Sequence, residues 1–153
     1  MLILAAAAAQ AQTTWRGLRF GMSEAEAKQA LPDLHPVEEP ATEGGESAAL
    51  TGPVDIGGCA GTAFVWFSDD RLSRVSIDVR EVDDCGSTAP RHKYRHEVRD
   101  AFKEKYGKPA AVKTAFGGAP KVTVWRTDEQ LIELRDVGDK LWTATYRPIP
   151  ADF

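Results

Sequence analysis

The sequence predicts an α+β fold, in which a two-layer domain packs two helices on one face of an antiparallel sheet. Three observations predict it. Helix signals occur at 23–31 and at 90–106, segments with strand patterning follow each helix, and one eight-residue stretch occurs twice. The fold that we expect is therefore built as two helix–meander repeats.

Length and composition favour a single folded domain. The chain has 153 residues, of which 42% are hydrophobic and 27% charged, and this balance excludes a disordered or fibrous class. The net charge of −4 gives no overall attraction for nucleic acid or for anionic lipid. We therefore expect no nucleic-acid partner.

Residues 1–11 have the pattern of a signal peptide. An uninterrupted apolar run reaches Ala9 and ends in Ala9-Gln10-Ala11, the small-x-small pattern that precedes cleavage, with Gln12 as the predicted mature start. The run is too short to span a bilayer, so we expect no transmembrane segment. The predicted mature domain is 12–153, with halves at about 12–86 and 87–153, in the periplasm or secreted.

The two cysteines of the chain, Cys59 and Cys85, have glycine neighbours in loop-like sequence. An even number of cysteines in an exported chain favours a disulfide. Closing this loop would stabilise the fold by about 3–4 kcal/mol in the chain-entropy model.

The first half begins with a strand-like segment over 13–20. Ser23 and Glu26 then form the Ser-x-x-Glu pattern of a capping box, and Pro32 ends the helix. The Pro-, Glu- and Gly-rich stretch 33–45 predicts a surface connection without an element. The strands that we expect after it are a weak one over 47–56, a strong one over 62–68 and an alternating one over 72–80.

The second half contains the longer helix. Pro90 suits its first turn, Gly107 suits its C-terminal end, and four apolar residues recur every fourth position: Tyr94, Val98, Phe102 and Tyr106. This spacing predicts one apolar stripe that faces the sheet. Three strands are predicted to follow, over 121–127, 131–136 and 141–147.

The internal repeat pairs 65–72 with 124–131. The two stretches align without gaps and share Val, Trp, Asp and Leu at matching positions, and the preceding helical segments 26–31 and 97–102 also align. The interpretation is that each half is one helix followed by one antiparallel meander. The alternative is that short hairpins with this pattern recur by chance.

The helix start at 20–26, Phe-Gly-Met-Ser-Glu-Ala-Glu, and the stop at 106–109, Tyr-Gly-Lys-Pro, carry a family resemblance. A meander after such a start resembles small bacterial envelope modules, namely the SmpA/OmlA outer-membrane-assembly lipoproteins and the tandem-repeat β-lactamase-inhibitor-type proteins. The chain lacks the anchoring cysteine of the lipoproteins. The resemblance implies a protein-binding rather than a catalytic role and carries over no binding residues.

A zinc site is one alternative function. His92 and His96 lie four residues apart on the predicted helix and would project from one face, and Cys59 and Cys85 would complete four ligands. A disulfide would consume both sulfurs, and the histidines share their face with several basic residues. A solvated basic face, which could also contact an acidic partner, is the other interpretation.

The sequence shows no recognisable catalytic pattern, because its acidic pairs lie in predicted turns and its three histidines have no nucleophile partner. The function that we expect is an exported, non-catalytic protein-interaction module of the cell envelope, without a cofactor, whose partner is another envelope protein. The alternative is a periplasmic small-ligand-binding protein, which would need an apolar cleft between helices and sheet. Candidate contact residues for a partner or ligand are Trp66, Trp125, Trp142, His92, His96 and Arg99.

Overall fold

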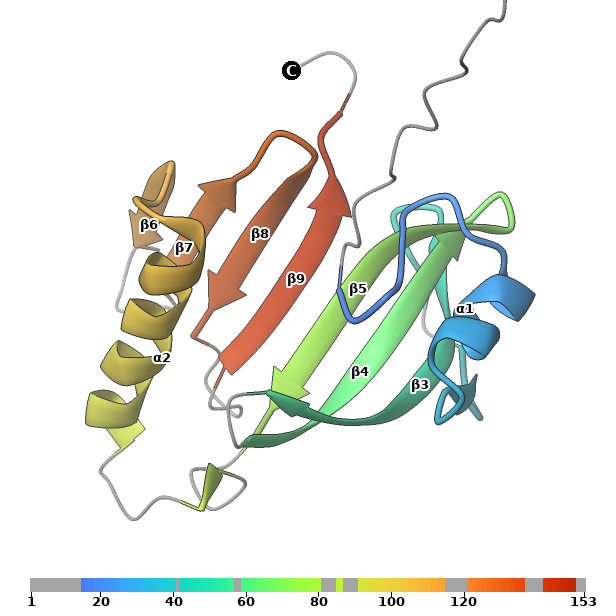
Figure 1. Cartoon of the computed structure of the whole chain (residues 1–153), viewed down its shortest axis with the longest axis horizontal. Helices are drawn as coiled ribbons and strands as arrows, with labels where there is room; N and C mark the ends of the chain where they lie inside the picture. Colours follow the sequence, from blue (N-terminus) through green and yellow to red (C-terminus); the bar gives the residue numbers. More distant parts are fainter. Residues whose placement is uncertain are drawn as a thin grey trace, which may run out of the picture.

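The computed structural model describes residues 15–40, 42–56, 59–80, 85–86, 91–114, 121–136 and 142–150, without the side chains of 43, 91–96 and 121. Two helices and nine strands lie within these residues (Figure 1). The helices are α1 (Glu24–Ala30) and α2 (Arg91–Tyr106). The strands are β1 (His35–Pro36), β2 (Thr42–Glu43), β3 (Glu46–Ile56), β4 (Cys59–Ser68), β5 (Arg71–Val79), β6 (Ala111–Thr114), β7 (Lys121–Arg126), β8 (Gln130–Arg135) and β9 (Trp142–Pro148).

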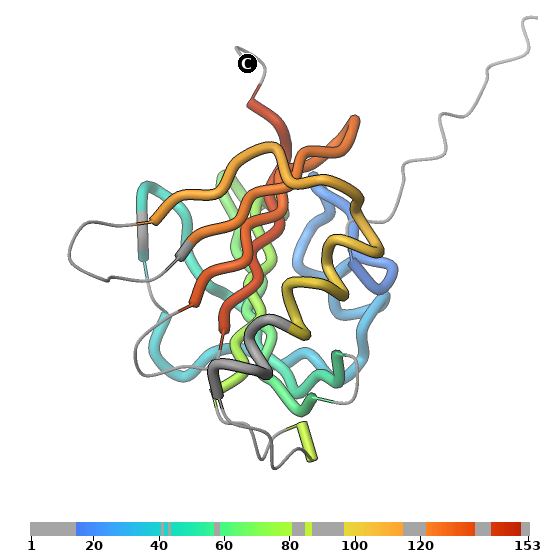
Figure 2. The backbone as a smooth tube through the Cα atoms, turned by 90° about the vertical axis from the view of Figure 1, so that its left-hand side faces the viewer, coloured from blue at the N-terminus to red at the C-terminus, as the bar shows by residue number. Residues whose placement is uncertain are grey.

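The strands form one antiparallel sheet in the order β1-β3-β4-β5-β9-β8-β7-β6, with β2 paired to β3. The meander β3–β4–β5 therefore meets the meander β7–β8–β9 through the pairing of β5 with β9. Figures 1 and 2 show both helices on the same side of this sheet. Because the sheet dominates and the helices are short, with 7 and 16 residues, the predicted balanced α+β class is wrong: the protein is mainly an antiparallel β-sheet.

Three of the strands lie where none was expected. The 33–45 stretch contains β1 and β2, which pair with β3, and β6 extends the opposite edge of the sheet. In the described part of the predicted 13–20 strand, residues 15–18 instead form a tight turn closed by a single bridge between Trp15 and Leu18. The three unexpected strands have only two to four residues and depend on pairing with a longer strand, so their own sequence carries little periodic signal.

Helix α1 begins as its sequence predicts. Ser23 is the N-cap, and the reciprocal bonds between Ser23 and Glu26 complete the capping box. The Ser23 backbone N–H donates a hydrogen bond to the Glu26 carboxylate. This bond is the main cause that lowers the pKa of Glu26 below its usual value. Ala27 is fully buried, and main-chain bonds between Gly21, Met22 and Leu72 fix the start of the helix to β5.

The core lies between the helices and one face of the sheet. Alternate residues of the central strands point into it, among them Val75, Ile77, Trp142, Ala144 and Tyr146, all at most 2% exposed. Helix α2 packs on this face through Val98 and Phe102, as the apolar stripe predicted. The ring of Phe102 lies 5.6 Å from that of Trp125 and 6.2 Å from that of Trp142. Aromatic contact therefore holds the helix to the second meander.

The two hairpins of the internal repeat differ in which face they bury. Val65 and Leu72 lie in the core, whereas Trp66 is half-buried on the opposite face of the sheet. In the second hairpin, Trp125 and its partner Ile132 lie in the core, so Val124 falls on the opposite face. The gapless alignment thus matches residues on opposite faces, although both halves contain a helix followed by a meander.

Candidate ligand-binding cleft

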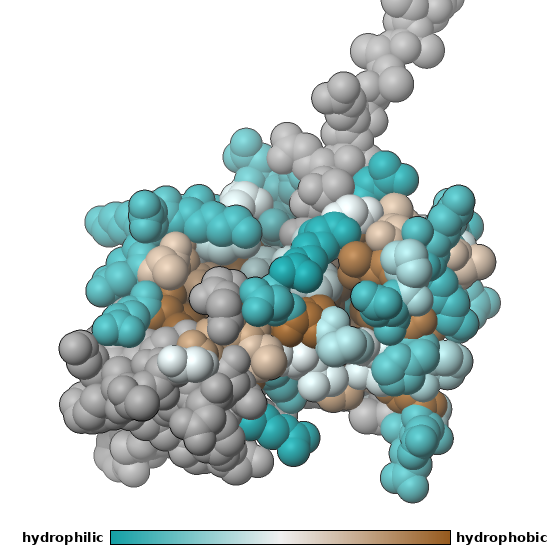
Figure 3. All heavy atoms as spheres, turned by 60° about the horizontal axis from the view of Figure 1, so that its bottom comes forward, coloured by the Kyte–Doolittle hydropathy of each residue, from teal (hydrophilic) through white to brown (hydrophobic). Residues whose placement is uncertain are grey.

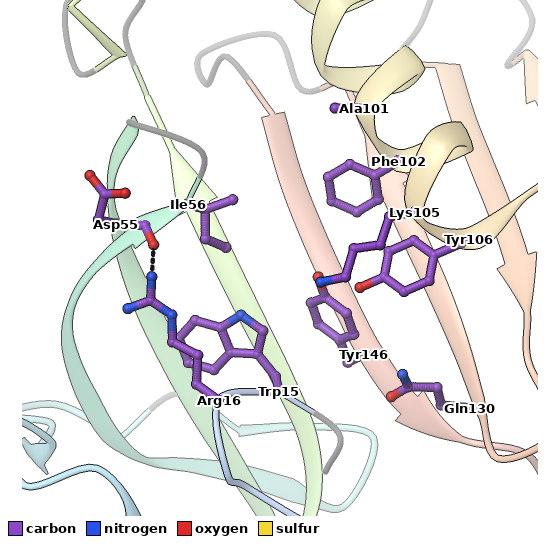
Figure 4. Close-up of a pocket in the computed structure, with 10 residues that line it drawn as sticks. All are labelled: Trp15, Arg16, Asp55, Ile56, Ala101, Phe102, Lys105, Tyr106, Gln130 and Tyr146. Atoms are coloured by element: carbon purple, nitrogen blue, oxygen red, sulfur yellow. Dashed lines mark hydrogen bonds between the residues drawn. The ribbon is translucent and has the colours of Figure 1, made fainter. Parts of the chain in front are cut away.

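A cleft of about 530 Å³ opens between α2 and the first half of the chain. One wall is the turn at Trp15 and the end of β3 at Ile56, and the other is the side of α2 that carries Phe102 and Tyr106 (Figure 4). Tyr146 of β9 lies between these walls. The other lining residues are Arg16, Asp55, Ala101, Lys105 and Gln130.

One side of α2 forms one wall of the cleft. Ala101 and Lys105 are four residues apart, as are Phe102 and Tyr106, so each pair lies on one side of α2 in successive turns. The rings of Phe102 and Tyr106 lie 5.8 Å apart. This wall therefore combines an aromatic surface with a lysine at its solvent edge.

The opposite wall depends on the tight turn after residue 14. The Trp15–Leu18 bridge holds the Trp15 ring at 7% exposure, beside β3. The Arg16 guanidinium donates a hydrogen bond to the main-chain carbonyl of Asp55, which joins the turn to β3 (Figure 4). This bond crosses between two distant parts of the chain and stabilises the wall.

The Tyr146 hydroxyl lies in the cleft and has a pKa that its surroundings shift strongly. Burial raises the pKa of Tyr146 well above its usual value, and the neighbouring Tyr106 and its hydrogen bond act in the same direction. Tyr146 therefore stays protonated, as a hydrogen-bond donor, at any physiological pH. The Lys105 ammonium lies 5.1 Å from the centre of the Tyr106 ring.

A second hollow, of about 280 Å³, extends the cleft towards the disulfide. Both spaces share Ile56, Ala101 and Phe102, so they are neighbours along α2 and are together called the groove. The second hollow adds Cys59, Glu97, Val98 and Trp142 to the lining. Figure 3 shows apolar atoms gathered near the middle of the molecular face that it presents, with hydrophilic side chains around them.

The predicted disulfide is confirmed. Cys59, at the start of β4, is bonded to Cys85, which lies between β5 and α2. Both sulfurs are therefore unavailable to a metal ion in this oxidised chain. Within the described part of the chain, no group of three or more His, Cys, Asp or Glu residues could hold a metal ion; the side chains of His92 and His96 lie outside that part.

The predicted tryptophan contacts divide between core and surface. Trp125 and Trp142 are at most 1% exposed and pack in the core, where Trp142 also lines the second hollow. The indole N–H of Trp142 has no acceptor among the described residues. Trp66 lies on the open face of the sheet with the Arg74 guanidinium 3.9 Å from its ring centre, and Arg74 also pairs with Glu46 at 3.0 Å.

Arg99 has a structural partner. Its guanidinium donates to the Asp136 carboxylate at 3.0 Å, and both side chains are largely buried, at 16% and 13% exposure. The pair links α2 to the end of β8. Arg99 therefore lies inside the helix–sheet contact rather than on an open basic face.

Sequence reasoning missed most of the groove. Trp15, Ile56 and Tyr146 were expected as parts of strands, and nothing in their local pattern marks them as neighbours across a cleft. Two sequence signals did fall on the groove: the apolar stripe of α2, which contains Phe102 and Tyr106, and the candidate contact Trp142, which lines the second hollow.

Comparison of the chain with protein-family models, with curated proteins and with solved structures finds no match. Among the described residues no helix is long and apolar enough to cross a membrane.

Proposed function

We propose that this chain is an exported, non-catalytic binding protein of the cell envelope, and that the groove along α2 holds an apolar ligand. The observation that carries the proposal is the cleft of about 530 Å³ between two aromatic walls. Clefts of this size with mainly apolar walls and a few polar groups are the usual form of small-molecule sites.

The polar groups of the cleft suit binding better than catalysis. Tyr146 stays protonated because burial raises its pKa, and its hydroxyl is hydrogen-bonded to Tyr106, so it cannot act as a base near neutral pH. Lys105 and Gln130 add donors at the edge of the cleft. These groups can orient a ligand without reacting with it.

A hollow of similar volume, about 510 Å³, lies beside α1, but its lining differs. It is formed largely by small and acidic residues, including Glu24, Asp69 and Asp70, and offers a single aromatic ring, that of Phe67. An apolar ligand would gain less by burying its surface there than between the walls of the α2 cleft.

The test is the binding of N-phenyl-1-naphthylamine, an uncharged fluorophore that brightens in apolar sites. We expect saturable binding to the natural chain and at least tenfold weaker binding to Ala101→Trp, because the new indole would fill the space that both parts of the groove share. Glu104→Trp is the matched control, since it adds the same ring to α2 at an exposed position that lines neither hollow.

Failure of the natural chain to bind the fluorophore, or equal binding by both tryptophan variants, would overturn the cleft proposal. The protein-interaction module would then be the remaining function, with the sheet face that carries Phe64 and Trp66 as the surface for another envelope protein.

A further inference from the structure

The two ends of the groove differ in charge. At one end the lining includes the cations Arg16 and Lys105, the amide of Gln130 and Asp55, whose carboxylate is directed away from α2 in Figure 4. The end near the disulfide includes Glu97 as its one charged residue and is otherwise apolar. A ligand that fills the groove lengthwise would therefore meet cationic side chains at one end only. This polarity restricts the chemistry of the ligand.

Lys105 is the cation best placed to meet a ligand. Its side chain is exposed at the edge of the cleft, it packs over Tyr106, and no carboxylate among the described residues pairs with it. The other lysine on this turn of α2 is different, because Lys103 bonds to Asp100 at 3.1 Å and lines neither hollow. Figure 4 shows the Lys105 side chain on the cleft side of the helix, with Tyr146 nearby.

The end of the groove near the disulfide offers one competing donor. The indole N–H of Trp142 has no acceptor among the described residues and could donate a hydrogen bond to an acceptor atom of a ligand. The Glu97 carboxylate lines the same hollow, and like charges repel. An anionic group is therefore favoured at the Lys105 end and disfavoured at the Trp142 end.

We infer that the ligand is a single-tailed amphipathic anion, with its acidic head group at Lys105 and its aliphatic tail along the groove towards Trp142. This inference rests on the proposed function, since it needs the groove to hold an apolar ligand. The tail gains by burying its surface between Ile56 and Phe102. The head group gains the Lys105 charge and the neighbouring phenol and amide donors.

Four compounds with the same ten-carbon tail test the inference by displacement of N-phenyl-1-naphthylamine. They are undecanoate, decyl sulfate, decanol and decyltrimethylammonium, each with a C10H21 tail. We expect both anions to bind at least five times more tightly than decanol, and the cation to bind most weakly. A preference for undecanoate over decyl sulfate would identify a carboxylate head group, and the reverse a sulfate- or phosphate-like one.

The Lys105→Gln variant should bind the anions about three- to fivefold more weakly, the size expected for an exposed ion pair, while its affinity for decanol stays the same. Lys103→Gln is the matched control and should bind all four compounds as the natural chain does. Equal binding of decanol and both anions by the natural chain, or an unchanged anion preference in Lys105→Gln, would overturn the inference while fluorophore binding still supported the cleft. Absence of fluorophore binding would overturn both proposals.

Discussion

Tyr146 shows how one residue serves both the core and the cleft. It is 2% exposed and faces Val75 and Ile132 across the sheet, yet it also lines the cleft. Burial is the main cause that raises its pKa, and Tyr106 adds to the effect. The folded protein therefore binds the phenol proton more tightly than the unfolded chain does, which links stability to pH.

The stability of the fold should fall in alkaline solution because of Tyr146. The unfolded phenol ionises near pH 10, while the folded one keeps its proton, so the contribution is complete below about pH 10 and is lost as pH rises further. The expected slope approaches about 1.4 kcal/mol per pH unit. Urea unfolding between pH 8.5 and 11 should show a shallower decline for Tyr146→Phe. Parallel declines in the two proteins would contradict the assignment.

Several single residues were predictable because their signal is local. The capping box at Ser23, the helix end at Gly107 and the pairing of Cys59 with Cys85 each follow from neighbouring residues or from simple counting. The face of Trp66 was not predictable in this way. Residues 64–67 are all apolar, so alternation cannot tell which of them point into the core.

At the scale of elements, Trp125 joins α2 to the sheet. Its ring packs against Phe102, and its Nε1 donates to the main-chain carbonyl of Gly107 at 2.9 Å, directly after the helix. That bond satisfies one carbonyl at the helix C-terminus, where intrahelical partners are missing. The position of the α2 wall of the cleft thus depends on β7.

Replacing Trp125 by Ala should lower the free energy of unfolding by about 3–5 kcal/mol, because it leaves a cavity in the core and an unsatisfied carbonyl. Trp66→Ala should cost about half as much or less, since Trp66 is half-buried on the opposite face. Urea unfolding of the two variants measures the difference. Equal losses would mean that the repeat positions are equivalent in packing after all.

The strands and helices were largely predictable, but the cleft between them was not. Sequence patterning located α2 and six of the nine strands to within a few residues, namely β3, β4, β5, β7, β8 and β9. The cleft depends instead on how far α2 lies from the Trp15 turn and the end of β3. That separation is set by packing between residues about 40 to 90 positions apart, such as Ile56 and Phe102, which no local pattern records.

At the scale of the whole molecule, the disulfide fixes the connection between the two halves. Cys59 begins β4 beside Ile56, and Cys85 lies between β5 and α2, with a sequence separation of 26. The bond therefore ties the segment that leads into α2 to the sheet at the far end of the groove. It should affect both stability and binding.

Replacing both cysteines by serine should lower the free energy of unfolding by about 3–4 kcal/mol in the chain-entropy model. Fluorophore affinity should also fall, because the start of α2 is no longer held near Cys59. Urea unfolding and fluorophore titration measure the two effects. A reductant should weaken the natural chain in the same way and leave the double variant unchanged; insensitivity of the natural chain would contradict the prediction.

The position of β9 in the sheet has a consequence for how the chain folds. It is the last strand in the sequence, yet it lies between β5 and β8 and joins the two meanders (Figure 1). The chain emerges N-terminus first from a ribosome or through a membrane. Strand β5 is therefore complete long before β9, which covers its edge, becomes available. During that interval the β5 edge is open to pairing with other chains. Correct folding therefore requires that β9 pairs with β5 before the open β5 edge pairs with a strand of another chain.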